Sequence, residues 1–164
     1  MASHHSMHKP RSEVTRRAAS AVSRALGNAD YALVGGAACS VLGSNRLTAD
    51  VDFVVPKGAT KTARALLKQH PTVSSVDKRT QHTTFVADPT VEIEILAPPA
   101  LFQQDFSPNT PTLLLDGVRV LKPALLINAK CGSLPQRNTE EKQSTDSEDI
   151  LFLLEWCARH KQYP

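Results

Sequence analysis

Apolar and polar residues follow two different periods along the chain, and the period changes several times. A spacing of three or four residues, typical of an amphipathic helix, predicts helices over residues 12–26, 60–69 and from 145 onwards. Shorter helices are expected at 36–42 and 123–130, the second because Pro123 suits a first helical position. Alternation or short apolar runs bounded by turn residues predict strands at 31–34, 50–55, 73–77, 82–87, 91–96 and within 113–121. This mixture predicts an α/β (α+β) fold, in which a small mixed β-sheet packs against helices.

Turn and cap residues set the expected boundaries between these elements. Asp88-Pro89 is expected to join two strands as a hairpin, and the proline-rich residues 98–111 are expected to form a loop. Residues 132–143 are polar and are expected to form a second loop. Thr145 and Glu148 have the spacing of a capping box, so the last helix is expected to begin there.

Acidic residues interrupt two of the predicted strands with the same alternation. Asp50 and Asp52 share one face of the first strand, roughly 7 Å apart, while apolar residues occupy the other face. Glu92 and Glu94 share one face of the strand at 91–96. If the two strands are neighbours, three carboxylates converge, as the oxygen ligands of Mg²⁺ or Mn²⁺ do. The alternative is a pair of solvated acids on an exposed sheet face, which the scarcity of Asp inside strands disfavours.

Gly35 and Gly36 lie at the predicted turn from the strand at 31–34 into the helix at 36–42. Glycine lets the backbone approach a ligand closely, and free amides at a helix start can hold phosphate oxygens. The alternative is a tight turn that needs glycine only for its conformation. The acidic residues downstream favour the phosphate-binding interpretation.

Together these motifs resemble the signature of the nucleotidyltransferase superfamily, which has a polymerase-β-like fold. The parts in common are an apolar strand with Gly35-Gly36, the acidic Asp50-Val51-Asp52, and a later carboxylate in Glu94-Ile95-Leu96. The stretch Arg46-Leu47-Thr48-Ala49-Asp50 is similar to the form found in small toxin-type, AbiEii-like members. The helical end is similar to theirs in Lys130, Arg137, Lys142, Asp146 and Asp149.

The resemblance implies a minimal nucleotidyltransferase fold that transfers a nucleoside monophosphate from an NTP to a hydroxyl acceptor and releases pyrophosphate. It implies that Asp50, Asp52 and Glu94 are catalytic and bind Mg²⁺ or Mn²⁺, with Glu92 as the other candidate for the third carboxylate. The residues implied for nucleotide binding are Gly35, Gly36, Arg46, Thr48 and Lys130. The chain departs from the family pattern in having Glu94 in place of the usual Asp, and Ala37 where many relatives carry Ser.

Several alternatives stay open at this level. Arg46 and Thr48 are equally well explained as a loop residue and the start of a strand, and Lys130 as a solvated residue late in a helix. Lys142, Asp146 and Asp149 either shape the acceptor side of the site or charge and cap the last helix, and the second interpretation is favoured. The acceptor is an unidentified small molecule, protein or RNA. The protein could also be a nucleotide-binding module without catalysis, or an enzyme that uses the carboxylates for acid–base chemistry on a small metabolite.

Composition limits the class of protein and its partners. The chain has 41% hydrophobic and 21% charged residues, which is ordinary for a soluble globular protein. A net charge of +3 suits a substrate that carries phosphate but gives no strong sign of a dedicated nucleic-acid surface. The cysteines lack disulfide or zinc spacing and are expected to be reduced thiols of a cytoplasmic protein, and no apolar run is long enough to span a membrane. The expected organisation is a disordered tail over 1–11 and a single nucleotidyltransferase-like domain over 12–164.

Overall fold

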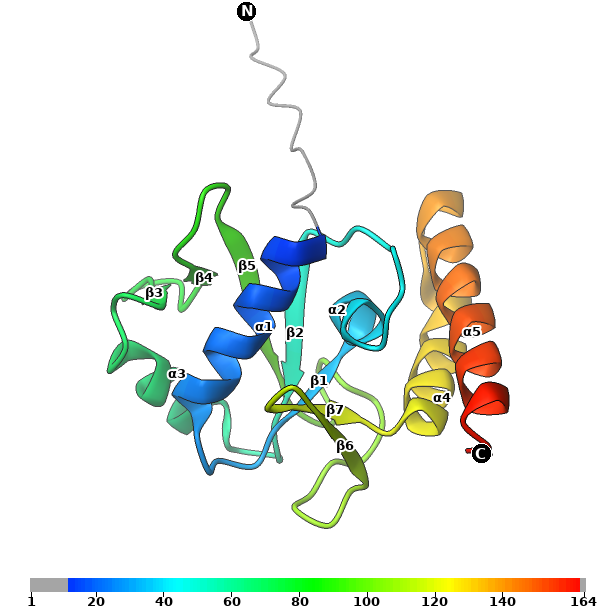
Figure 1. The fold of residues 1–164 in the computed structure, drawn as a ribbon. Helices are drawn as coiled ribbons and strands as arrows, with labels where there is room; N and C mark the ends of the chain where they lie inside the picture. The colour runs from blue at the N-terminus through cyan, green and yellow to red at the C-terminus, as the bar shows by residue number, and fades with distance from the viewer. Residues whose placement is uncertain (1–11, 163–164) are drawn as a thin grey trace, which may run out of the picture.

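A seven-stranded sheet forms the centre of the computed structural model, which describes residues 12–162 (Figure 1). The expected disordered tail lies outside the described residues. The strands are β1 (Ala32–Val34), β2 (Asp50–Val54), β3 (Ser74–Val76), β4 (Thr83–Phe85), β5 (Val91–Leu96), β6 (Thr112–Leu115) and β7 (Val118–Leu121). Their order across the sheet is β3-β4-β5-β2-β1-β7-β6. The pairs β1–β7 and β2–β5 are parallel and the others antiparallel, so the predicted mixed sheet is confirmed.

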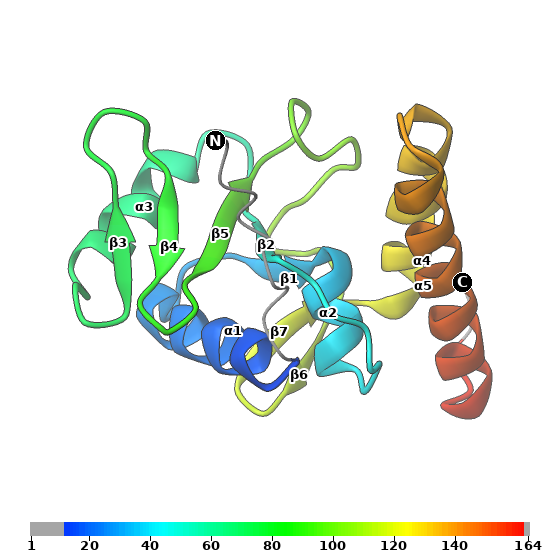
Figure 2. The same cartoon turned by 90° about the horizontal axis from the view of Figure 1, so that it is seen from above.

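Helices cover the sheet and flank one of its ends. They are α1 (Ser12–Leu26), α2 (Gly35–Val41), α3 (Thr60–Lys68), α4 (Pro123–Ser133) and α5 (Glu140–Arg159), with a 3-10 turn η1 (Leu134–Gln136). Helices α1 and α3 lie along one face of the sheet, while α4 and α5 stand side by side next to α2 (Figures 1 and 2). Among residues 12–162, no helix combines the length and the apolar character that crossing a membrane requires.

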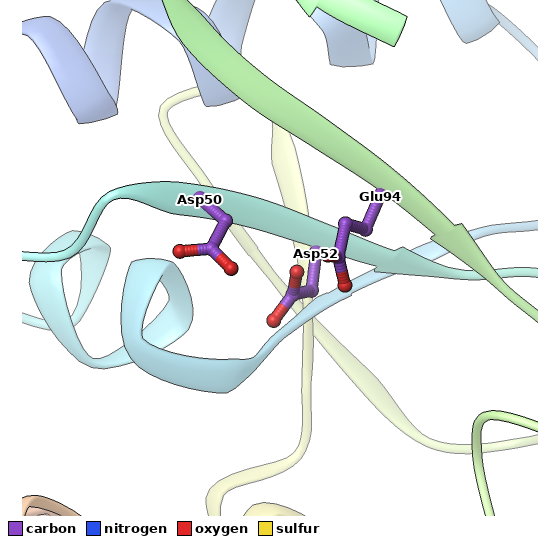
Figure 3. Close-up of side chains that lie close together, drawn as sticks. All are labelled: Asp50, Asp52 and Glu94. Atoms are coloured by element: carbon purple, nitrogen blue, oxygen red, sulfur yellow. The ribbon is translucent and has the colours of Figure 1, made fainter. Parts of the chain in front are cut away.

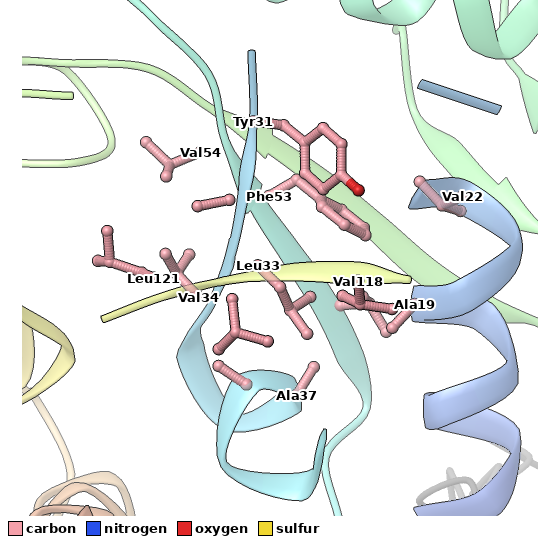
Figure 4. Packing of buried hydrophobic residues seen from close by; sticks show 14 of the residues in the cluster. Ala19, Val22, Tyr31, Leu33, Val34, Ala37, Phe53, Val54, Val118 and Leu121 are labelled. Atoms are coloured by element: carbon pink, nitrogen blue, oxygen red, sulfur yellow. The ribbon is translucent and has the colours of Figure 1, made fainter. Parts of the chain in front are cut away.

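Part of the hydrophobic core lies between the sheet and α1 (Figure 4), and the same cluster extends to residues of the other four helices. Val51 and Phe53 are fully buried because alternation along β2 turns them toward this layer. Phe53 packs edge-on against Tyr31, with ring centroids 5.7 Å apart, and burial of such a ring stabilises the fold by about 1.5–3 kcal/mol. The same alternation turns the acidic residues of β2 to the opposite face.

The pairing of β2 with β5 fixes which acidic residues are neighbours. The two strands run parallel, with Asp50 opposite Glu92 and Asp52 opposite Glu94. Side chains opposite one another in a ladder lie on the same face, so all four carboxylates project from one side of the sheet. A slip of one residue would move either pair into the core, which makes this register strongly specified.

Two predictions about the C-terminal region are wrong. Residues 132–143 are not a loop, because α4 continues to Ser133, η1 follows, and α5 begins at Glu140. The N-cap is Thr139, whose side chain accepts a hydrogen bond from the Lys142 amide at 3.2 Å. Thr145 instead lies inside α5 and donates to the Glu141 carbonyl at 2.7 Å. Acidic residues in the first turn suit the helix dipole, so the polar sequence here marks an exposed helix rather than a loop.

Candidate active site

Three of the predicted site residues converge on the face of the sheet away from α1. Asp50 and Asp52 project from the same side of β2, and Glu94 extends toward them from β5 (Figure 3). One carboxylate oxygen from each residue lies within 4.8 Å of the other two. The structure therefore brings together the three carboxylates that sequence analysis selected.

Glu92 lies on the same face but outside this cluster. Its carboxylate is 3.6 Å from Nε2 of His82, which directly precedes β4. Both side chains are about half exposed. Of the two candidates for the third carboxylate, Glu94 is the one whose oxygen reaches Asp50 and Asp52. The contact with Glu92 explains the position of the His82 side chain, so no role for His82 in the acidic cluster is needed.

The close approach of these acids raises the pKa of two of them. Burial, followed by the negative charges of Glu94 and Asp50, raises the pKa of Asp52 to about 7. Burial, followed by the charge of Asp50, also raises the pKa of Glu94. Asp52 Oδ1 is buried and has no hydrogen-bond partner among the described residues. A set of crowded carboxylate oxygens with an unsatisfied buried member fits a hard divalent cation such as Mg²⁺ or Mn²⁺.

The two glycines at the start of α2 make room for other side chains of the site. Gly35 has φ +66°, and a Cβ there would lie 2.5 Å from Asp52 Oδ2. A Cβ on Gly36 would overlap the Arg46 guanidinium and come within 3.2 Å of Thr48 Oγ1. Glycine is thus required by close packing within the chain, in addition to the turn that sequence analysis predicted.

The positions of Thr48 and Ala37 show which atoms their side chains contact. The Thr48 hydroxyl donates to the Asp50 carbonyl oxygen at 3.2 Å, which holds the backbone where β2 begins. Ala37 is fully buried in the core (Figure 4) and lines neither of the cavities beside the acidic cluster. The absence of a serine hydroxyl at position 37 therefore removes nothing from the wall of the site.

Lys130 belongs to a buried network of ion pairs that links α4, α5 and the loop before β2. Its Nζ lies 2.7 Å from Asp149 Oδ2 and 3.3 Å from Asp146 Oδ1. The other oxygens of these carboxylates pair with Arg46 Nε at 3.3 Å and with Arg137 Nε at 2.7 Å. Of the two roles that sequence analysis left open for Asp146 and Asp149, capping of the last helix is wrong, because both residues are buried in the middle of α5. Their spacing of three residues, on the same face as the buried Leu153, was the available signal.

Two adjoining cavities meet at the acidic cluster. The first is polar, has a volume of about 600 Å³, and contains the three carboxylates facing the cations Arg46, Lys130, Arg137 and Lys142. The second has a volume of about 360 Å³ and lies between α4, the end of β5 and the loop that follows it. Its walls are mainly apolar, with side-chain amides from Gln103, Gln104, Asn128 and Gln136. Gly35, Asp52, Lys130 and Arg137 line both cavities.

Two solved structures share this arrangement of strands and helices. One is an antigenic nucleotidyltransferase-like protein from Paracoccidioides brasiliensis, which matches with a TM-score of 0.68 and 26% identity over 88% of this chain and 77% of that one. This chain has a nucleotidyltransferase-like fold. The Megavirus polyadenylate synthase matches with a TM-score of 0.51 and 13% identity over 91% of this chain, which spans only 32% of the synthase. No protein-family model and no curated protein matches the sequence.

The nucleotidyltransferase-like fold and the acidic cluster together support nucleotidyl transfer as the general class of activity. The more specific similarity to toxin-type, AbiEii-like members stays a prediction, because neither structural neighbour is described as one.

Proposed function

We propose that the protein transfers a nucleoside monophosphate from an NTP to a hydroxyl group and releases pyrophosphate. The observation that carries this proposal is the convergence of Asp50, Asp52 and Glu94 within 4.8 Å, on a nucleotidyltransferase-like fold. Mg²⁺ or Mn²⁺ held by these three residues would neutralise charge that develops on the phosphates during transfer. The three free cysteines suit the reducing cytoplasm, where we place the reaction.

The two cavities divide the NTP between them in this proposal. The triphosphate lies in the polar cavity, where four cations face the carboxylates. The nucleoside lies in the smaller cavity, whose apolar walls suit the faces of a base and whose amides can bond to its edge. Because Asp52 and Gly35 line both spaces, the α-phosphate is placed at their junction.

Glu94 lines the polar cavity and is the exposed member of the acidic cluster, so the acceptor hydroxyl approaches from its side. The hydroxyl oxygen forms a bond to the α-phosphorus, while the bond from that phosphorus to the bridging oxygen of the β-phosphate breaks. The electron pair of the broken bond leaves with pyrophosphate, and the hydroxyl proton passes to the Glu94 carboxylate. Holding the reacting atoms in line is the main contribution of the chain in this scheme.

The reaction is tested with NTPs that carry the label on either the α- or the γ-phosphate, in the presence of Mg²⁺ or Mn²⁺ and a cell extract. Nucleotidyl transfer moves the α-label to an acceptor and releases the γ-label as pyrophosphate. Asp52→Asn is expected to lower transfer on the order of 1,000-fold, whereas Glu92→Gln, outside the cluster, leaves it near the wild-type rate. Transfer of the γ-label, or full activity in Asp52→Asn, would contradict the proposal. NTP binding without turnover would identify a binding module instead.

A further inference from the structure

The ion-pair network on α5 explains how two of the cations in the polar cavity are held in place. Asp149 is 2% exposed and lies on α5, while Arg46 belongs to the loop before β2 and Lys130 to α4. The three residues come from separate segments, and the Asp149 carboxylate is the group that both cations share. Its Oδ1 lies 3.3 Å from Arg46 Nε and its Oδ2 lies 2.7 Å from Lys130 Nζ.

Arg46 is held at its guanidinium by Asp149 and at its backbone by two serines. Its guanidinium lies against Gly36 so closely that a Cβ there would overlap it, and its Nε is the atom that pairs with Asp149. Its backbone is held as well, because the amide donates to Ser44 Oγ at 3.2 Å and the carbonyl accepts from Ser40 Oγ at 3.1 Å. A planar guanidinium held in this way presents its remaining donors in a fixed direction.

Lys130 is fixed by the second oxygen of the same carboxylate and by Asp146. The buried ammonium donates a hydrogen bond to Asp146 Oδ1 at 3.3 Å and forms an ion pair with Asp149 Oδ2 at 2.7 Å. Lys130 lines both cavities, as Asp52 does. Its ammonium therefore belongs to the wall at the junction of the cavities, where the proposed function places phosphate.

We infer that Asp149 is a positioning residue, which sets the spacing of Arg46 and Lys130 so that both bind the triphosphate of an NTP. This inference rests on the proposed function and adds a role for α5, which contributes no residue to the acidic cluster. Asp149 acts through the two cations and does not itself touch the phosphate. It also joins α5 to the loop beside Gly36, so that the helical hairpin and the sheet together form one anion site.

The inference predicts the direction in which the affinity for an anion changes on Asp149→Asn. A positioning role and simple electrostatics predict opposite directions. Asp149→Asn removes a negative charge next to two cations, and Coulomb attraction alone would then strengthen the binding of an anion. An asparagine amide, however, can accept from one cation only, because its NH₂ group faces the other with a donor. One cation loses its position, so binding is expected to weaken roughly 10-fold, as it does when groups that orient a ligating residue are removed.

The probe is inorganic tripolyphosphate with Mg²⁺, measured by calorimetry beside Mg²⁺-NTP, because tripolyphosphate has no nucleoside and reports on the anion site alone. Asp149→Asn is expected to lower the affinity for tripolyphosphate and for Mg²⁺-NTP by about the same factor. Glu155→Gln makes a comparable change of charge on the exposed side of the same helix and is expected to bind both as the wild type does. Thermal unfolding of each variant shows whether a change in affinity accompanies a loss of the fold.

A double-mutant cycle with Arg46→Gln identifies the residue through which Asp149 acts. The two changes together are expected to weaken tripolyphosphate binding by less than the product of their separate effects. If Asp149→Asn does not fold, Asp149→Glu keeps the charge but moves the carboxylate by one methylene, and weaker binding is again expected. Binding by folded Asp149→Asn or Asp149→Glu that equals or exceeds the wild-type affinity would overturn the inference alone. Absence of tripolyphosphate and NTP binding in the wild type would contradict the proposed function and the inference with it.

Discussion

At the scale of single residues, Asp52 carries the strongest physical signal in the molecule. Burial and two neighbouring carboxylates raise its pKa from an ordinary value of 3.8 to about 7, and its Oδ1 has no hydrogen-bond partner among residues 12–162. A divalent cation would remove both penalties at once, because it stabilises the ionised form and supplies a partner to the oxygen. Without metal, ionisation of the Asp52 side chain therefore lowers the stability of the fold.

That cost predicts how stability depends on pH in the absence of metal. Between pH 4 and 7 the folded protein keeps a proton on Asp52 that the unfolded chain has lost, so the free energy of unfolding falls as pH rises through the pKa range of 3.8 to about 7. The slope from this one group is at most about 1.4 kcal/mol per pH unit. Urea unfolding in EDTA is expected to show this fall, and Mg²⁺ is expected to restore stability at pH 8.

Asp52→Asn is the matched control, since it removes this carboxyl group and leaves every other ionisable side chain of the sequence in place. Its stability in EDTA is expected to lose the fall that Asp52 produces, and Mg²⁺ is expected to stabilise it much less. Identical pH profiles for the variant and the wild type would show that Asp52 has no raised pKa.

Gly36 offers a second prediction at this scale. A Cβ at position 36 would displace the Arg46 guanidinium, so Gly36→Ala is expected to weaken NTP binding and to destabilise the fold by about 1–3 kcal/mol. Gly132→Ala is the control for stability alone, because Gly132 lines the smaller cavity but a Cβ there has no neighbour closer than 3.9 Å. It is expected to stabilise the protein by about 0.5–1 kcal/mol. Equal effects of the two substitutions on thermal unfolding, with NTP binding by Gly36→Ala unchanged in calorimetry, would exclude the close contact with Arg46.

At the scale of secondary-structure elements, the parallel pairing of β2 with β5 creates the acidic cluster. Both strands alternate apolar and acidic residues, and the apolar face of each is buried, so the register that satisfies the core also aligns Asp52 with Glu94. This is why the cluster could be predicted from sequence once the strands were assumed to be neighbours. The assumption itself stayed open in the sequence, because alternation does not say which strands pair.

The start of α5 is the element that sequence analysis placed wrongly. Thr139 and Thr145 are both candidates for the N-cap. Thr145 has the capping-box spacing but lies inside the helix. Thr139→Ala is therefore expected to destabilise the protein by about 1 kcal/mol. Thr145→Ala is expected to change stability by less than about 0.5 kcal/mol, since alanine favours a helix interior. Urea unfolding of the two variants distinguishes the positions, and a larger loss at Thr145 would support the later helix start.

At the scale of the whole molecule, the site lies where three parts of the fold meet: the β2–β5 pair, the turn into α2, and the α4–α5 hairpin (Figure 2). The acidic residues could be predicted because they follow the alternation of their strands. The glycine turn could be predicted because it directly follows a strand in the sequence. The resemblance named Arg46 and Lys130, but their ion pairs depend on packing between residues far apart in the chain, such as Arg46 and Asp149, which the sequence does not pair. The second cavity was unpredictable for the same reason, since its walls come from α4 and the loop after β5.

The central claim of this account is that carboxylates from β2 and β5 share one divalent cation. Mn²⁺ titration followed by electron paramagnetic resonance measures this directly, because the spectrum of free Mn²⁺ weakens when the ion binds. Wild type and Glu92→Gln are expected to bind Mn²⁺ with similar affinity, while Asp52→Asn and Glu94→Gln bind it at least roughly 10-fold more weakly. Equal binding by all four proteins, or loss of binding in Glu92→Gln alone, would contradict the claim.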